Sequence, residues 1–107
     1  MERKIRRKVR PQHPGAILRR MLEELATDGD LRSLTQTELA KRLGVSRRTL
    51  NELIHERRNM TADMAIRLSR VFSTTPDIWL NLQKTVDLWD AARANKNKYA
   101  KLKPIAA

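Results

Sequence analysis

The stretch QTELAKRLGVSRRTLNEL, residues 36–53, decides the fold. Ala40 falls where a first helix would cross a second, and its small side chain allows two backbones to approach closely. Gly44 falls at the turn between them, where a positive φ is often needed and glycine adopts it without a Cβ clash. The apolar residues of the stretch recur at helical spacing and can close a small core: Leu39, Leu43, Val45, Leu50 and Leu53. The spacing therefore predicts a helix-turn-helix.

Capping residues support these helices. Thr35 and Glu38 have the spacing of a capping box before the first helix, and Ser46 is a favourable N-cap for the second. This motif class lays its second helix in the major groove of DNA, with residues near the helix start at the base edges. The residues in those positions are Ser46, Arg47, Arg48, Asn51 and His55. A generic corner of two helices is the alternative, but the joint register of Ala40, Gly44 and the apolar positions favours a DNA-binding geometry.

Length and composition indicate one small domain. The chain has 107 residues, about the size of a single domain. It has no cysteine, so disulfides and thiolate metal sites are excluded. No apolar run approaches the roughly 20 residues of a membrane span, and the basic N-terminus lacks the apolar core of a signal peptide. We expect a cytoplasmic protein without a membrane partner.

The positive charge is concentrated at the two ends. The net charge is +11, of which residues 1–10, with six cations and one anion, carry +5. Residues 93–107 hold five cations and no anion, which leaves residues 11–92 with only +1. Such runs are usually solvated tails. The functional interpretation is a flexible arm that neutralises phosphates and adds salt-dependent, non-specific affinity for nucleic acid.

The rest of the chain also has helical patterns. Pro14 suits the first turn of a helix, Thr61 the N-cap of another, and Thr75-Pro76-Asp77 the start of a last helix that runs to about Ala94. Residues 27–33 are expected to form a loop, and residues 5–9 have a weak strand pattern. The apolar faces are Ile17, Leu18, Met21, Leu22 and Leu25 in the first helix, and Met64, Ala65, Leu68, Val71 and Phe72 in the helix after Thr61.

The last helix is apolar on more than one side. One stripe consists of Ile78, Trp79, Leu82, Val86 and Trp89, while Leu80 and Leu88 lie off it. A helix with apolar residues on several sides must be buried on several sides. We therefore expect Trp79 in the core and a dimer or partner interface at Leu80, Leu88 and Trp89. Core packing of the whole helix is the alternative.

Catalytic and metal sites find little support. His13 and His55 lie far apart and lack carboxylates at metal-ligand spacing, and pairing on a helix surface explains Glu52 three residues before His55. Asp28 and Asp30 lie in a loop without a third ligand. No glycine-rich phosphate loop or nucleophile elbow occurs. We expect no enzyme, no metal and no cofactor.

Three segments together resemble the HigA family of antitoxins, which belong to the phage-repressor-like, XRE-type helix-turn-helix class. They are HPGAILRRML at 13–22, TQTELAKRLGVSRRTLNELI at 35–54 and MTADMAIRLSRVFSTTPDIWLNLQKTVDLW at 60–89. The resemblance covers roughly residues 11–92, and the combination is more specific than the helix-turn-helix alone. It implies an all-α, five-helix lambda-repressor-like domain over residues 11–94 that binds DNA and dimerises. Basic tails would occupy residues 1–10 and 95–107.

The resemblance also implies a function. Such proteins bind and neutralise a RelE-like, HigB-type toxin that cuts mRNA, and as homodimers they bind a palindromic operator and repress their own operon. By position, the DNA-facing residues would be Ser46, Arg47, Arg48, Thr49 and Asn51, with Gln36 and Thr37 at the phosphates. Two alternatives stay open: a stand-alone phage-type repressor without a toxin, and a protein-interaction module whose helix-turn-helix does not read DNA.

Physical chemistry gives these positions roles. Arginine offers a bidentate fork to guanine, and asparagine pairs with adenine. Gln36 and Thr37, near a helix N-terminus, can hold a phosphate together with backbone N–H groups. Arg57 and Arg58, in the polar turn after the second helix, either contact phosphates or stay solvated. A dimer would present two recognition helices about 34 Å apart, which predicts an inverted repeat with half-sites one DNA turn apart.

Overall fold

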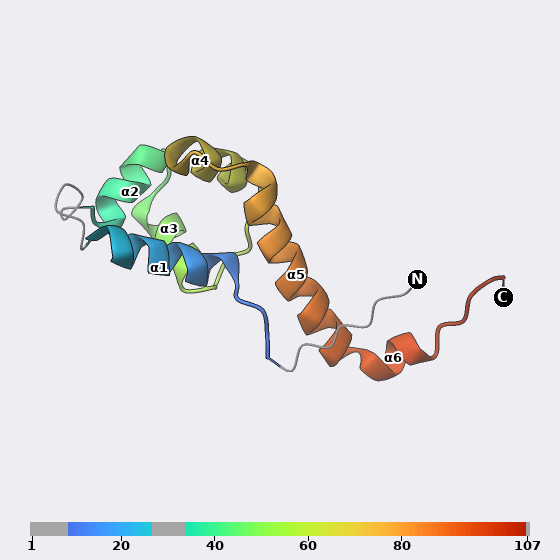
Figure 1. The fold of residues 1–107 in the computed structure, drawn as a ribbon. Coiled ribbons are helices and arrows are strands. Elements are labelled where there is room, and N and C mark those ends of the chain that lie inside the picture. The colour runs from blue at the N-terminus through green and yellow to red at the C-terminus, as the bar shows by residue number, and fades with distance from the viewer. Residues whose placement is uncertain (1–8, 27–33, 107) are drawn as a thin grey trace.

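A computed structural model describes residues 9–26 and 34–106 of the chain. This part contains six helices and no strand (Figure 1). They are α1 (Pro14–Ala26), α2 (Gln36–Leu43), α3 (Arg47–Ile54), α4 (Ala62–Phe72), α5 (Pro76–Ala94) and α6 (Lys96–Ala100). The prediction of an all-α fold is confirmed, with five helices within residues 11–94. The short α6 was not predicted, because it lies in the segment expected to be a tail. The weak strand pattern, except Val9, and the loop at 27–33 lie outside the described residues.

The helix starts follow local chemistry. The hydroxyls of Thr35, Ser46 and Thr61 accept backbone N–H groups three residues ahead, at 3.2, 3.0 and 3.2 Å. These bonds satisfy N–H groups that have no partner within the helix, so the three predicted N-caps are confirmed. The capping box itself is half formed: Glu38 lies 3.6 Å from Arg42 on the next turn of α2. Thr75 has an extended N-cap backbone, but its side chain caps no N–H in the described part of the chain.

The core lies between α1, α2, α3, α4 and the first half of α5. Its centre includes Trp79, which is 2% exposed and donates its indole N–H to the Thr74 hydroxyl at 2.9 Å. The other buried apolar residues include Leu18, Leu39, Leu50, Leu53, Ile54, Leu68 and Val86. Burying each large apolar side chain contributes about 1.5–3 kcal/mol, so the hydrophobic effect is the main stabilising force.

The predicted stripe on the last helix is only partly correct. Trp79 and Val86 are buried, but Ile78 is 49% exposed. Successive residues of an α-helix are separated by about 100°, so a helix that turns Trp79 inward turns Ile78 to its flank. The third residue on the buried face of α5 is Gln83, which follows Trp79 by four positions.

The start of α1 packs directly on the backbone of α3. A Cβ atom at Gly15 would overlap the carbonyl oxygen of Leu53, so this contact requires glycine. His13, the residue immediately before α1, is 4% exposed, and its Nδ1 accepts the Gly15 N–H at 2.9 Å. An imidazole that accepts through Nδ1 must be neutral, and burial lowers the pKa of His13 from its ordinary value.

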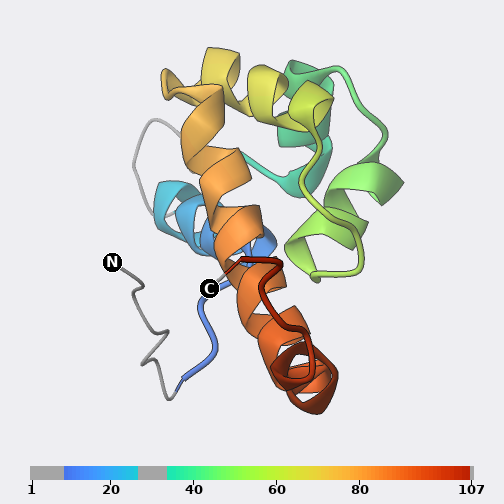
Figure 2. The same cartoon turned by 90° about the vertical axis from the view of Figure 1, so that its right-hand side faces the viewer.

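The C-terminal half of α5 and all of α6 extend beyond the body formed by α1 to α4 (Figures 1 and 2). The molecule is elongated, with principal extents of 58 × 26 × 26 Å. The exposed apolar residues of this extension include Leu88, Tyr99 and Leu102. The fold therefore has a compact part that carries the helix-turn-helix and a projecting part that leaves apolar surface uncovered.

Replacing Gly15 by alanine should lower the free energy of unfolding by about 3 kcal/mol, because the added Cβ forces α1 away from α3. Urea denaturation measures this change. Arg19→Ala, at an exposed position of α1, is the control and should change stability by less than about 0.5 kcal/mol. Equal stability of Gly15→Ala and the wild type would show that the close contact with Leu53 is not required.

Acid should destabilise the fold through His13. Because burial lowers the folded-state pKa of His13, the unfolded chain takes up a proton below pH 6.5 that the folded chain refuses. The free energy of unfolding should therefore be highest above pH 6.5 and fall as the pH decreases below it. His13→Asn should flatten this dependence between pH 7 and 5. The urea midpoint of each protein, measured at several pH values between 5 and 7, shows whether its pH dependence is flattened or unchanged.

Candidate nucleic-acid interface

A tight turn joins α2 to the candidate recognition helix α3. Gly44 has a φ of 71°, in the left-handed region, so the predicted positive φ is confirmed. The Gly44 N–H donates to the Lys41 carbonyl at 3.1 Å and the Val45 N–H to the Ala40 carbonyl at 3.0 Å. This pattern ends a helix by satisfying its last carbonyl groups. Ala40 is 3% exposed, as expected for a site of close packing.

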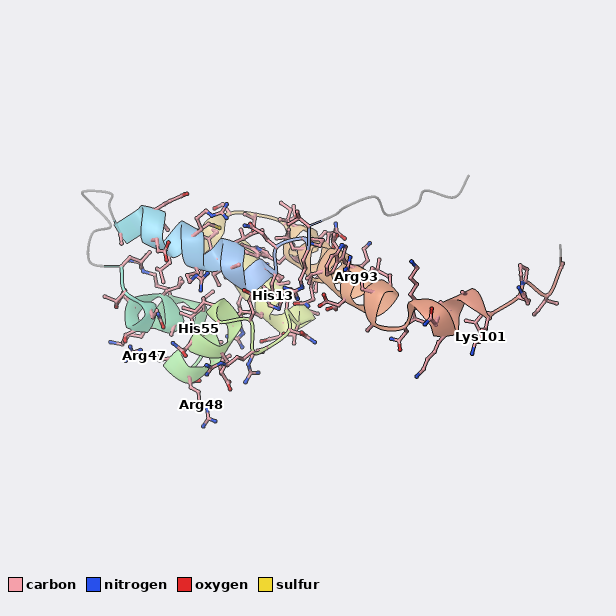
Figure 3. The ribbon with its side chains drawn as sticks, turned by 90° about the horizontal axis from the view of Figure 1, so that it is seen from below. His13, Arg47, Arg48, His55, Arg93 and Lys101 are labelled. Atoms are coloured by element: carbon pink, nitrogen blue, oxygen red, sulfur yellow. The ribbon has the colours of Figure 1, made fainter. Side chains whose placement is uncertain are left out.

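The start of α3 presents two arginines to solvent. Arg47 and Arg48 extend from the side of the domain that carries α2 and α3, opposite α1 (Figure 3). The side chain of Arg48 is 88% exposed, and its Nε lies 3.9 Å from Glu52. A pair this exposed is weak and easily exchanged for another anion. The structure therefore leaves both guanidinium groups accessible to a ligand.

Ser46 and Thr49 have an internal role as well. The Ser46 hydroxyl accepts the Thr49 N–H at 3.0 Å and donates to the Thr49 hydroxyl at 2.9 Å. Both side chains thus shape the first turn of α3, although both were predicted as DNA contacts. Thr49 is half-buried and Ser46 is exposed.

Gln36 and Asn51 are brought together from two helices. The Asn51 side-chain amide donates to the Gln36 Oε1 at 3.1 Å, and both residues are half-buried. Thr37, beside Gln36 at the start of α2, is exposed. The sequence placed Asn51 at the bases and Gln36 at the phosphates, but did not predict their contact. A hydrogen bond between them restricts the rotamers of both amides before any ligand binds.

The end of α3 differs from its prediction. We expected Glu52 to pair with His55; instead Glu52 accepts from Arg58 at 2.9 Å and lies near Arg48. The Arg58 hydrogen bond lowers the pKa of Glu52. His55, exposed at the C-cap, has its Nδ1 2.8 Å from the Asn51 carbonyl oxygen. Arg57 and Arg58 are both exposed on this turn, and Arg58 is partly neutralised by Glu52.

Arg10, the last residue of the predicted flexible arm, is paired with carboxylates of the folded domain. Its guanidinium forms two hydrogen bonds to the Asp90 carboxylate, at 2.8 and 2.9 Å, and a third to Glu56 at 3.3 Å. These bonds raise the pKa of Arg10 and lower that of Asp90. These carboxylates belong to α5 and to the turn after α3. Both are distant from Arg10 in sequence, so the basic N-terminal run could not predict the contact. Residues 1–8 lie outside the described part of the chain.

Gln83 is a structural residue that the sequence analysis missed. It is 5% exposed, and its Oε1 accepts the Met60 N–H at 2.7 Å. Its amide donates to Asp87 at 2.9 Å and to Asn59 at 3.3 Å. A buried backbone N–H needs such a partner, so Gln83 fixes the loop that leaves α3. The sequence signal that could have identified Gln83 is its position four residues after Trp79, on the same face of the helix.

The predicted interface residues differ in exposure. Leu88 is 56% exposed, whereas Leu80 is half-buried and packs against the core. Trp89 is half-buried, and the Arg93 guanidinium lies 4.7 Å from its ring centroid, a cation–π distance. Arg93 lies on α5 and Lys101 just beyond α6, at the end opposite Arg47 and Arg48 (Figure 3). The projecting end is therefore both apolar and basic.

The described residues hold no group of three or more His, Cys, Asp or Glu side chains that could bind a metal ion. Within the same ranges, no helix is both long and apolar enough to cross a membrane. His13, one of the two histidines considered above, has its Nδ1 engaged with Gly15.

Comparison of the sequence with known proteins identifies the same motif. A helix-turn-helix family model matches residues 30–79. The transcriptional regulator YbaQ of Escherichia coli strain K12 is 46% identical over 81 residues, which cover 76% of this chain and 66% of that regulator. The chain thus spans just under two thirds of the length of that relative. The antitoxin HigA-1 of Vibrio cholerae is 38% identical over 72 residues, 67% of this chain and 68% of that antitoxin.

A structural comparison gives the same result. The Pseudomonas aeruginosa antitoxin HigA, solved with the higBA promoter, superposes with a TM-score of 0.74 at 39% sequence identity. The alignment covers 90% of this chain and 99% of that one. The similarity therefore extends through the helix-turn-helix and most of the remaining helices.

Proposed function

Because this chain belongs to the HigA family of helix-turn-helix antitoxins, we propose that it represses its own operon as a homodimer on a palindromic operator and neutralises a HigB-type toxin. The observation that carries the DNA-reading part is the surface at the start of α3. There Arg47 and Arg48 are exposed, and Asn51 is held by Gln36. Operator binding by a close relative, seen in the promoter complex of the Pseudomonas aeruginosa antitoxin, supports the same assignment.

In the proposed complex, α3 enters the major groove. The forks of Arg47 and Arg48 donate to guanine O6 and N7, and Asn51 pairs with an adenine edge. Gln36 keeps Asn51 in place and, with Thr37, holds a phosphate at the N-terminus of α2. Ser46 and Thr49 keep the first turn of α3 in shape while they face the DNA. The set at the end of α3, which would contact phosphates, is His55, Arg57 and Arg58.

The basic ends would add affinity without sequence preference. Lys96, Lys98, Lys101 and Lys103 are exposed, and neutralising phosphates with such residues makes binding depend on salt. We propose the same for the cations before Arg10, while Arg10 itself is held by Asp90.

Arg48→Ala should weaken operator binding by about 1–3 kcal/mol and relax base preference at one position. Gel shifts with a set of single-base operator variants measure both effects. Arg19→Ala removes the same charge from an exposed position of α1 and should change neither. Unchanged affinity and preference in Arg48→Ala would remove this residue from the base-reading set.

The homodimer is proposed to form through the projecting part of α5. Leu88 is exposed there, and Trp89 with Arg93 provides an aromatic and cationic anchor of the kind that is frequent in interfaces. Leu80 would lie at the edge, because most of its surface already contacts the core. A palindromic operator requires that the two-fold axis of this dimer be directed so that both α3 helices lie on one side.

Leu88→Glu should convert the dimer to a monomer and weaken operator binding at least tenfold, because a buried unpaired carboxylate is costly in an interface. Light scattering coupled to size-exclusion chromatography measures the mass. Ile66→Glu changes an equally exposed apolar residue, 51% exposed on α4, and should leave the mass unchanged. If both variants remain dimeric, the interface lies elsewhere.

Co-expression with the adjacent reading frame tests the toxin partner. We expect the two products to co-purify and the chain to restore growth to cells that express the toxin. Operator binding without a co-purifying partner would favour the stand-alone repressor. Co-purification without operator binding would favour an interaction module whose helix-turn-helix does not read DNA.

A further inference from the structure

Arg67 reaches from α4 to the turn of the helix-turn-helix. Its Nη1 donates to the carbonyl oxygens of Leu43 and Gly44, at 2.9 and 3.2 Å, and its Nε donates to Asp63 at 2.8 Å. The first two acceptors lie 24 and 23 residues away in sequence, outside the helix that carries Arg67. The contact therefore ties α4 to the junction of α2 and α3.

The acceptors are the groups that a helix end leaves unsatisfied. The last carbonyls of an α-helix have no partner within the helix, and the C-terminal end of its dipole favours a cation. Gly44 also leaves room for this contact, since a Cβ at this position would lie 2.9 Å from the Arg67 Nη1. Glycine at the turn thus serves both the positive φ and the space that the guanidinium occupies.

The turn sets the direction of α3. The Gly44 and Val45 amides close the end of α2, and Ser46 begins α3 immediately afterwards. A change in the backbone at Leu43 or Gly44 would rotate Arg47 and Arg48 relative to Gln36, which is fixed at the other end of α2. An error of about 1 Å in such a constellation is enough to lose most of its function.

We propose that Arg67 is a positioning residue for DNA reading: it holds the turn, and with it the angle of α3, without contacting DNA. The inference rests on the proposed function. Two of its hydrogen bonds go to backbone carbonyls of the turn and the third to Asp63 on its own helix, and its side chain is 39% exposed, against 88% for Arg48.

The test compares Arg67→Met, which keeps an unbranched apolar stem and removes every donor, with Arg70→Met. Arg70 is exposed on the same helix, so the second variant removes an equal charge. Asp63→Ala is a further control, because it removes the ion pair within α4 and leaves the carbonyl acceptors in place. Each protein is assayed on the DNA upstream of its own gene and on a scrambled duplex, at several salt concentrations.

Arg67→Met should bind the operator about tenfold more weakly and the scrambled duplex as the wild type does, with an unchanged salt slope. A residue that neutralises a phosphate would instead lower the slope by about 1. Arg70→Met and Asp63→Ala should retain operator affinity within twofold. Equal losses in Arg67→Met and Arg70→Met, or a reduced slope in Arg67→Met, would overturn the proposal.

Hydrogen exchange on the free protein provides a second readout that does not depend on DNA. In Arg67→Met, the Gly44 and Val45 amides should exchange about tenfold faster, while the amides of α5 keep their protection. Unchanged exchange at the turn would overturn the proposal. If Arg67→Met unfolds, Arg67→Lys, which keeps one donor group, should show intermediate turn exchange and operator affinity. If the wild-type protein does not bind the operator, the proposed function is contradicted. The exchange data would still decide whether Arg67 holds the turn.

Discussion

An eight-residue helix cannot maintain its own shape in water, and α3 has eight residues. Helix nucleation is costly enough that isolated segments below about 12 residues are marginal. The structure therefore supports α3 from outside, and much of that support goes to backbone groups. Gly15 allows α1 to approach the Leu53 carbonyl, Arg67 binds the carbonyls before α3, and Gln83 binds the Met60 amide after it. The helices around the motif are thus part of what gives α3 its shape and position.

The support that α3 needs from its surroundings also accounts for how several of the protein's arginines are used. Many arginines of the compact part are paired with carboxylates, and Arg10, Arg58 and Arg67 each form a bond of 2.8 or 2.9 Å to one. These cations organise the fold around α3. Accessible charge at the two ends of the molecule includes Arg47 and Arg48 at the start of α3 and the lysines of the C-terminal extension. In the proposed complex, sequence reading and bulk attraction to phosphates therefore fall to different parts of the molecule.

Local rules predicted the local features. Thr35, Ser46 and Gly44 were identified from their own positions, because caps and left-handed turns depend on a few neighbouring residues. Contacts between distant segments escaped prediction: nothing near Arg10 indicated Asp90, and nothing near Arg67 indicated the turn. The apolar pattern of the last helix was ambiguous for a related reason. Ile78 and Trp79 are both apolar, and only the packing of distant segments determines which of them is buried. The predicted DNA contacts were largely found on one surface, but the Gln36–Asn51 bond depended on two helices meeting.

The exposure of Arg47 and Arg48 has a consequence for how such proteins diverge. Substitutions at solvent-exposed positions that pack against nothing change the folding free energy little. The supports of α3 and the projecting end lie elsewhere in the chain. In the proposed mode of DNA reading, new operator preferences therefore arise by changing these two side chains, while the scaffold is inherited intact. Duplicated copies in one genome could in this way become insulated from each other's promoters through very few mutations.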